Sequence, residues 1–162
     1  MDKTYDAYVE HMQKNADINH AMAVLGWDKE VNMPIGGSNF RSRQLSTLAG
    51  ISHDLFTDKA FGDLMMKLND SDSMSPKQRR NIEISLKDYQ KATKFERKFV
   101  EQKSLLISKG YQAWIEARKE NNYTLYQNAL QALIDITKEE AQILGYSGHP
   151  YDAMLVHRSL CQ

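Results

Sequence analysis

The chain has 162 residues, of which 41% are hydrophobic and 26% are charged. This composition is typical of one globular domain and excludes an intrinsically disordered chain. Lys and Arg together number 21, as do Asp and Glu, so the formal net charge is zero. Because nucleic acids and anionic membranes attract basic surfaces, we expect neither as a partner. No apolar run approaches the roughly 20 residues of a membrane-spanning helix.

The cysteine content and the start of the sequence bear on location. The single cysteine, Cys161, rules out an internal disulfide and a cysteine-rich metal site, and it fits a reducing compartment. The first six residues are polar and lack the apolar core of a signal peptide. We therefore expect a cytoplasmic protein.

Apolar and small side chains recur every three or four residues near the start, which predicts a long helix over residues 4–31. This stripe consists of Tyr5, Tyr8, Val9, Met12, Ala16, Asn19, Ala23 and Trp27. The helix must end before Pro34, because the residue preceding a proline is pushed out of the helical region. Ser38 is predicted to cap the next helix, over residues 38–55.

The same periodicity predicts four more helices further along the chain. They span about residues 57–68, 76–91, 95–119 and 124–144. Thr57 is predicted to cap the first of them. Ser75-Pro76-Lys77-Gln78 is the clearest start signal, since it combines a cap residue, a proline at the first helical position and a glutamine three residues after the cap. Gly110 marks a kink or a close helix crossing, and Gly145 ends the last helix.

No segment alternates with the period of a strand, so no sheet is expected. The predicted fold is all-α. It is one bundle of about six antiparallel helices, several of them long, in a single domain over residues 1–155.

The histidines argue against a zinc site in this chain. Zinc peptidases place two histidines four residues apart on one helix, with a glutamate between them. None of the five histidines lies four residues from another. Asp17, three residues before His20, is the nearest approach to a metal pattern, and a second such motif is missing. We expect His20 to be merely hydrogen-bonded, and we expect no metal ligand and no catalytic residue.

The corner between the first two helices carries the most informative motif. Trp27-Asp28-Lys29-Glu30 precedes the break, and the stretch from Arg41 to Gln44 follows it. In one interpretation Trp27 anchors the core, the acids are solvated, and an Arg–Asp pair braces the corner. In the other the corner faces a substrate cleft, and Asp28, Glu30 and Arg41 are candidates for its wall.

The segment from Leu25 to Gly37 resembles the opening of the carboxypeptidase Taq family, which shows Leu-x-Trp-Asp-x-Glu-x-x-Met-Pro-x-Gly-Gly. Gln44-Leu45, Trp114-Ile115-Glu116-Ala117-Arg118, Gly145-Tyr146 and Tyr151-Asp152 then match family motifs in the same order. The resemblance covers about residues 4–155. Residues 156–162 depart from the family pattern as a divergent tail, which suggests a truncated, frameshifted or split gene.

The resemblance implies a helical zinc metallocarboxypeptidase that trims peptide C-termini, commonly as a dimer. The family's His-Glu-x-x-His helix and downstream glutamate have no counterpart here. We therefore expect an N-terminal helical portion that holds no zinc and is inactive alone. Its expected partner is a second copy of itself or a missing catalytic portion. The alternatives are a non-catalytic subunit that complements a separate catalytic chain, and a helical binding or scaffold module.

Overall fold

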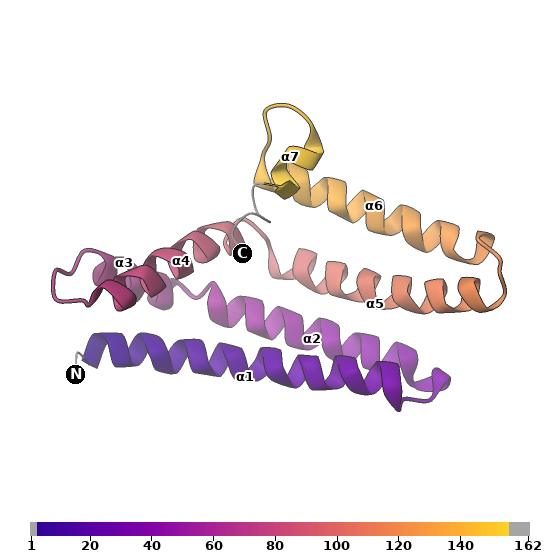
Figure 1. Ribbon diagram of the computed structural model, residues 1–162, viewed down its shortest axis with the longest axis horizontal. Helices are drawn as coiled ribbons and strands as arrows, with labels where there is room; N and C mark the ends of the chain where they lie inside the picture. The colour runs from indigo at the N-terminus through magenta and orange to yellow at the C-terminus, as the bar shows by residue number, and fades with distance from the viewer. Residues whose placement is uncertain (1–2, 156–162) are drawn as a thin grey trace. The chain divides into compact units, whose positions relative to one another are not determined.

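The computed structural model describes residues 3–155, and within this range the chain is helical and contains no strand (Figure 1). The elements are α1 (Lys3–Val31), the 3₁₀ turn η1 (Ile35–Gly37), α2 (Ser38–Phe56), α3 (Lys59–Asn69), α4 (Pro76–Ala92), α5 (Arg97–Lys119), α6 (Thr124–Leu144) and α7 (Pro150–Leu155). The all-α prediction is confirmed. The predicted tail lies outside the described residues. The chain divides into two units, residues 1–101 and 102–162.

The first unit is built on α1, which packs with two of its faces. One face lies along α2, where His11 Nε2 bonds the Leu55 carbonyl at 2.8 Å and Asn15 Oδ1 accepts from Ser52 Oγ at 2.8 Å. The other face meets α3 and α4, where Tyr8 Oη lies 2.8 Å from Ser85 Oγ. The buried core of the unit consists of Tyr8, Phe61, Met65, Leu68 and Ile82. The hairpin of α3 and α4 thus covers the first half of α1.

The predicted apolar stripe of α1 is only partly buried. Tyr5, Tyr8, Val9 and Met12 pack in or against the core. Asn19, Ala23 and Trp27 continue the same stripe but are exposed. The periodicity predicted the helix correctly, and the stripe is buried only in part because in this unit α3 and α4 reach along only part of α1.

The N-terminal caps predicted from the sequence are confirmed for one helix and wrong for another. The capping box of α4 is confirmed: Ser75 Oγ accepts from Gln78 N at 3.3 Å, and Gln78 Oε1 accepts from Ser75 N at 2.9 Å. The cap of α3 is Asp58, whose Oδ1 accepts from Phe61 N at 3.0 Å, so the prediction of Thr57 was wrong. Thr57 instead follows the end of α2, where its hydroxyl bonds the His53 carbonyl.

Ser38 is not the cap of α2 either. It is the first residue of that helix, Gly37 precedes it without a side-chain cap bond, and the Ser38 hydroxyl is buried without a hydrogen-bond partner in the described part of the chain. The physical reason is η1, whose turn leads directly into α2 with Gly37 already in a helical conformation, φ −82° and ψ −8°.

The second unit contains the rest of α5, α6 and α7. A Cβ atom at Gly110 would lie 2.7 Å from Leu133 Cδ1, so the Leu133 side chain of α6 packs directly against this glycine of α5. Lys103 forms an ion pair with the buried Glu140 on α6. The short helix α7 packs against α6 and was not predicted. None of the helices in residues 3–155 combines the length and apolar character that crossing a bilayer requires.

Candidate functional site

Arg41 is the centre of the corner between α1 and α2. Its Nη1 lies 2.7 Å from Asp28 Oδ2 and donates to the Leu25 carbonyl, also at 2.7 Å. Its Nε donates to Gln44 Oε1 at 3.0 Å. The side chains of Arg41 and Asp28 are 16% and 35% exposed, so the pair is partly shielded from water. The expected Arg–Asp brace is confirmed, and it fixes the end of α1 against the start of α2.

Glu30 is not part of this brace. Its side chain is exposed and makes no ion pair within residues 3–155. Its neighbour Lys29 is only 8% exposed, and burial lowers the pKa of the Lys29 ammonium, while the charge of Glu30 raises that pKa by a smaller amount. The structure therefore brings Asp28 and Arg41 together and leaves Glu30 apart. The role of these three residues in a cleft wall stays a prediction.

An open pocket of about 310 Å³ lies beside the brace. Leu25, Phe40, Arg43, Gln44, Thr47 and Leu48 line it. The Arg43 guanidinium sits 5.1 Å from the centroid of the Phe40 ring, a cation–π contact. Gln44 belongs to both features, because it lines the pocket and also accepts the bond from Arg41. The pocket is apolar with one cationic edge, and sequence reasoning did not find it.

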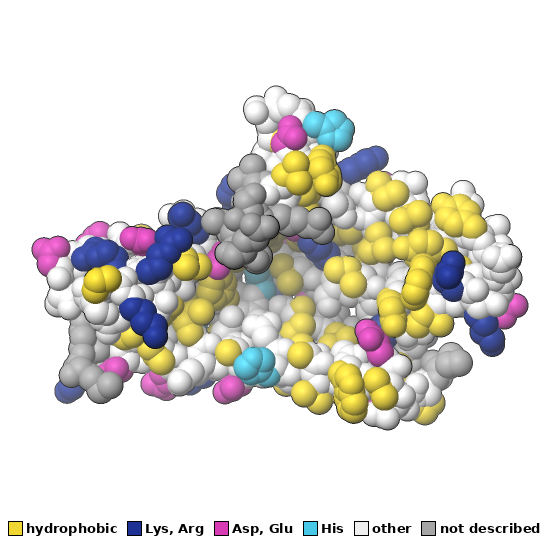
Figure 2. Space-filling model, in the orientation of Figure 1, with side chains coloured by type: hydrophobic (Ala, Val, Ile, Leu, Met, Phe, Trp, Pro, Cys, Tyr) yellow, Lys and Arg dark blue, Asp and Glu magenta, His cyan; other side chains and the backbone are white. Residues whose placement is uncertain are grey.

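Exposed hydrophobic side chains cover the adjoining end of α1, which Figure 2 shows in yellow. Val24, Trp27 and Val31 are 64%, 60% and 60% exposed. Their spacing of three and four residues puts them on one side of the helix. The interpretation of Trp27 as a core anchor is wrong for the described chain. We call these three side chains the α1 patch.

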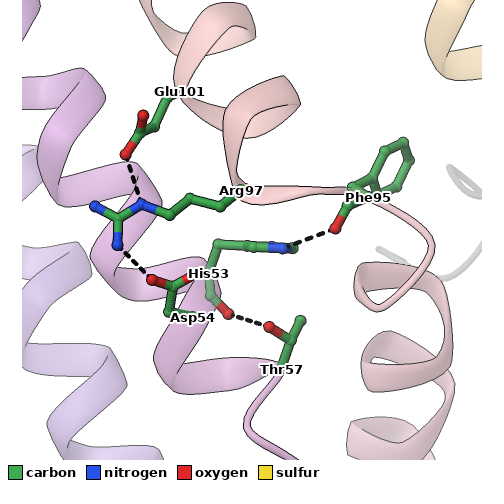
Figure 3. A network of polar contacts seen from close by, with 6 residues as sticks. All are labelled: His53, Asp54, Thr57, Phe95, Arg97 and Glu101. Carbon is green, nitrogen blue, oxygen red and sulfur yellow. Dashed lines mark hydrogen bonds and ion pairs between the residues drawn. The ribbon is translucent and has the colours of Figure 1, made fainter.

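A second polar network joins α2 to the start of α5 within the first unit (Figure 3). Arg97 pairs with Asp54, and its Nε lies 2.7 Å from Glu101 Oε1. Hydrogen bonds to Glu101 and to Asp54 raise the pKa of the Arg97 guanidinium. His53 Nε2 lies 2.9 Å from the Phe95 carbonyl oxygen. The network has a structural role, because it ties the segment after α4 to α2.

Two of the described histidines serve packing and a turn. His11 stacks on Phe61 with ring centroids 3.8 Å apart, and His149 Nδ1 accepts from Tyr151 N at 3.2 Å. His20 is exposed and has no hydrogen bond within residues 3–155, so the expectation of a hydrogen-bonded His20 was wrong. His157 lies outside the described residues.

A zinc ion does not fit the described residues. Between Lys3 and Leu155, no group of three or more His, Cys, Asp or Glu side chains could hold a metal ion. We therefore derive no catalytic step through zinc from this part of the chain.

Comparison with known proteins gives the family. Residues 7–158 match the model of the carboxypeptidase Taq (M32) metallopeptidases, so the chain belongs to that family. Thermostable carboxypeptidase 1 of Pyrococcus furiosus is 33% identical over 138 residues, which are 85% of this chain and 28% of that protein. Carboxypeptidase 1 of Bacillus subtilis is 26% identical over 154 residues, or 94% of this chain and 31% of that protein.

Solved structures agree with this assignment. The crystal structure of BsuCP matches with a TM-score of 0.90 at 25% identity, over 94% of this chain and 31% of that one. The structure of Pyrococcus furiosus carboxypeptidase matches with a TM-score of 0.74 at 30% identity, over 96% of this chain and 31% of that one. The resemblance expected from the Leu25–Gly37 motif is thereby confirmed, and the chain spans about a third of its relatives.

Proposed function

We propose that this chain forms a helical part of a zinc metallocarboxypeptidase that removes residues from peptide C-termini. Membership of the M32 family supports the activity, and the two curated relatives described above carry the name carboxypeptidase. The chain matches 28% and 31% of those relatives, and its described residues hold no metal-ligand group. In this proposal the zinc chemistry belongs to other residues of the active assembly, and this chain provides packing and a wall of the substrate cleft.

The observation that carries the proposal is the unequal covering of α1. In its first half, one stripe of the helix is buried against α3 and α4. In its second half the stripe continues as exposed side chains, ending in the α1 patch. Burying a large apolar side chain contributes about 1.5–3 kcal/mol, so a surface of this kind favours a partner. The remainder of the M32 fold is the partner we propose.

The first experiment is a zinc and activity measurement on the purified chain. We expect neither stoichiometric zinc nor chelator-sensitive release of C-terminal residues from peptides. The second experiment co-expresses this chain with a separate chain that carries the portion of an M32 carboxypeptidase containing the His-Glu-x-x-His segment. The co-purified complex should then show chelator-sensitive carboxypeptidase activity. Stoichiometric zinc together with hydrolysis by this chain alone would refute the proposal that the zinc site lies in other residues of the assembly. An inactive complex would refute the carboxypeptidase assignment.

A helical binding module is the second candidate, and the pocket beside Phe40 favours it. Two results together would support this candidate over the first. The chain would bind peptides saturably without zinc, and the co-expressed complex would show no hydrolytic activity.

Self-association and location complete the proposal. When the catalytic portion is absent, the α1 patch pairs with a second copy, because exposed apolar patches promote association. Light scattering should give the mass of a dimer, and Trp27→Asp should give a monomer. Met66→Asp, which changes another exposed hydrophobic residue on α3, should leave the dimer intact. A monomeric wild type would contradict this part.

A cytoplasmic location belongs to the same proposal, since the single cysteine fits a reducing compartment.

A further inference from the structure

The turn between α5 and α6 is fixed by its own backbone. Asn122 N donates to the Ala117 carbonyl at 2.9 Å and Asn121 N to the Arg118 carbonyl at 3.3 Å, which is the Schellman pattern at a helix end. Asn121 takes the left-handed conformation that this pattern requires, with φ 46°. The Asn122 side chain then accepts from Thr124 N at 3.1 Å and starts α6. These bonds therefore define the backbone path from α5 into α6.

Side chains around this turn line an open pocket of about 400 Å³ that the function proposed above does not use. Its walls include Trp114, Arg118, Asn121, Tyr123 and Tyr126. Trp114 is 45% exposed and stacks on Tyr111 with ring centroids 6.0 Å apart, while Tyr123 is 62% exposed. The volume lies within the usual range for ligand pockets. Tryptophan, tyrosine and arginine are also the residue types that dominate binding energy at interfaces.

Arg118 gives the pocket its charge. Its guanidinium makes no ion pair and no hydrogen bond within residues 3–155, and no acidic side chain lines the pocket. Two other exposed arginines are paired, Arg80 with Glu83 and Arg97 with two carboxylates, whereas the exposed Arg43 lies over the Phe40 ring. A guanidinium presents a planar fork of donors that matches a carboxylate. The free donors of Arg118 therefore favour an anionic group of that shape.

We propose that this pocket binds a peptide by pairing a carboxylate with Arg118 and placing the adjacent aromatic side chain against Trp114 and Tyr123. The carboxylate comes either from the C-terminus of the peptide or from an acidic side chain next to an aromatic residue, and the chemistry is the same. Offset stacking and edge-to-face contacts with the two exposed rings hold the aromatic group. Because no zinc and no hydrolysis are involved, this binding stands or falls independently of the carboxypeptidase proposal.

The test uses Trp114 as its own reporter. The chain has two tryptophans, so Trp27→Phe leaves Trp114 as the single indole fluorophore. The probes are N-acetylphenylalanine, its C-terminal amide, and N-acetylaspartyl-phenylalaninamide. We expect a saturable change in emission with N-acetylphenylalanine and about twofold to fivefold weaker binding of the amide, the range for an exposed ion pair. Binding of the aspartyl peptide in place of N-acetylphenylalanine identifies an acidic side chain as the source of the carboxylate.

Matched variants separate the pocket from general charge effects. Arg118→Gln should abolish the preference for acid over amide, whereas Lys119→Gln, which removes the neighbouring exposed cation, should preserve it. Tyr123→Ala should weaken all probes that bind. Helical circular dichroism of each variant checks folding. Three results would overturn the proposal. They are equal binding of acid and amide, a preference for the acid that survives in Arg118→Gln, and no saturable change in emission up to roughly 10 mM probe, where the binding free energy would be weaker than about −3 kcal/mol.

Discussion

Replacing Arg41 by glutamine tests whether the brace holds the α1–α2 corner. The change removes an ion pair to Asp28, worth about 1 kcal/mol once partial exposure is taken into account. It also removes a charge-assisted bond to the Leu25 carbonyl, worth about 1–1.5 kcal/mol. The Asp28 side chain is 35% exposed and stays in contact with water, so the loss of its partner adds no cost of burying an unpaired charge. We expect Arg41→Gln to lower the free energy of unfolding by about 2 kcal/mol, or Tm by about 4–8 °C at this chain length.

The assay is urea and thermal unfolding in a Trp114→Phe background, so that Trp27 fluorescence reports the first unit and circular dichroism reports the whole chain. Arg43→Gln is the matched control, because Arg43 is exposed and makes only the Phe40 contact, which is worth about 0.5–1 kcal/mol. A double-mutant cycle with Asp28→Asn isolates the ion pair and should give a coupling near 0.5–1 kcal/mol. If Arg41→Gln costs no more than Arg43→Gln, or if the coupling is zero, the brace does not stabilise the corner.

Two more substitutions and a pH profile test the packing of the first unit. A Cβ at Gly26 of α1 meets nothing within 4 Å, so Gly26→Ala should stabilise the chain by about 0.5–1 kcal/mol. A Cβ at Gly62 would lie 2.3 Å from the Tyr89 hydroxyl and 2.4 Å from its ring, so Gly62→Ala should destabilise by about 1–3 kcal/mol. Urea denaturation measures both changes in the free energy of unfolding. If Gly26→Ala and Gly62→Ala changed it in the same direction, the packing described here would be contradicted. Burial raises the pKa of Tyr8, so stability should fall as pH rises above the ordinary phenol value near 10. Tyr8→Phe should reduce that fall, and an unchanged profile would exclude Tyr8 as its source.

Much of the fold follows from signals that lie close together in the sequence. The capping box at Ser75 begins α4 where expected, because all of its bonds are made within four residues. The break after α1 follows from Pro34, whose effect on the preceding residue is steric. The helix α7 was missed because its six residues are too few for a periodic stripe. Thr57 and Asp58 are both good cap residues, and only the backbone at Asp58, with φ −55° and ψ 132°, decides between them.

The candidate site was predicted in part for a similar reason. Asp28 and Arg41 flank one short connection, so an ion pair between them could be anticipated. Glu30 stands two residues beyond Asp28, which turns its side chain by about 200° around the helix and away from the brace. The open pockets could not be anticipated, since each is formed by side chains from two turns or helices whose spacing depends on packing.

The exposure of Trp27 depends on chain segments that no local pattern contains. By angle alone, Trp27 belongs with Tyr5 and Met12 on one face of α1, because 22 residues bring a helix round to within about 40° of its starting direction. Tyr5 and Met12 pack against the core that α3 and α4 complete, whereas Trp27 extends past it. The apolar stripe keeps one direction along α1, but α3 and α4 cover only its first half. This favours a fold in which another surface packs against the second half of the stripe. Relatives about three times as long as this chain contain enough polypeptide to provide that surface.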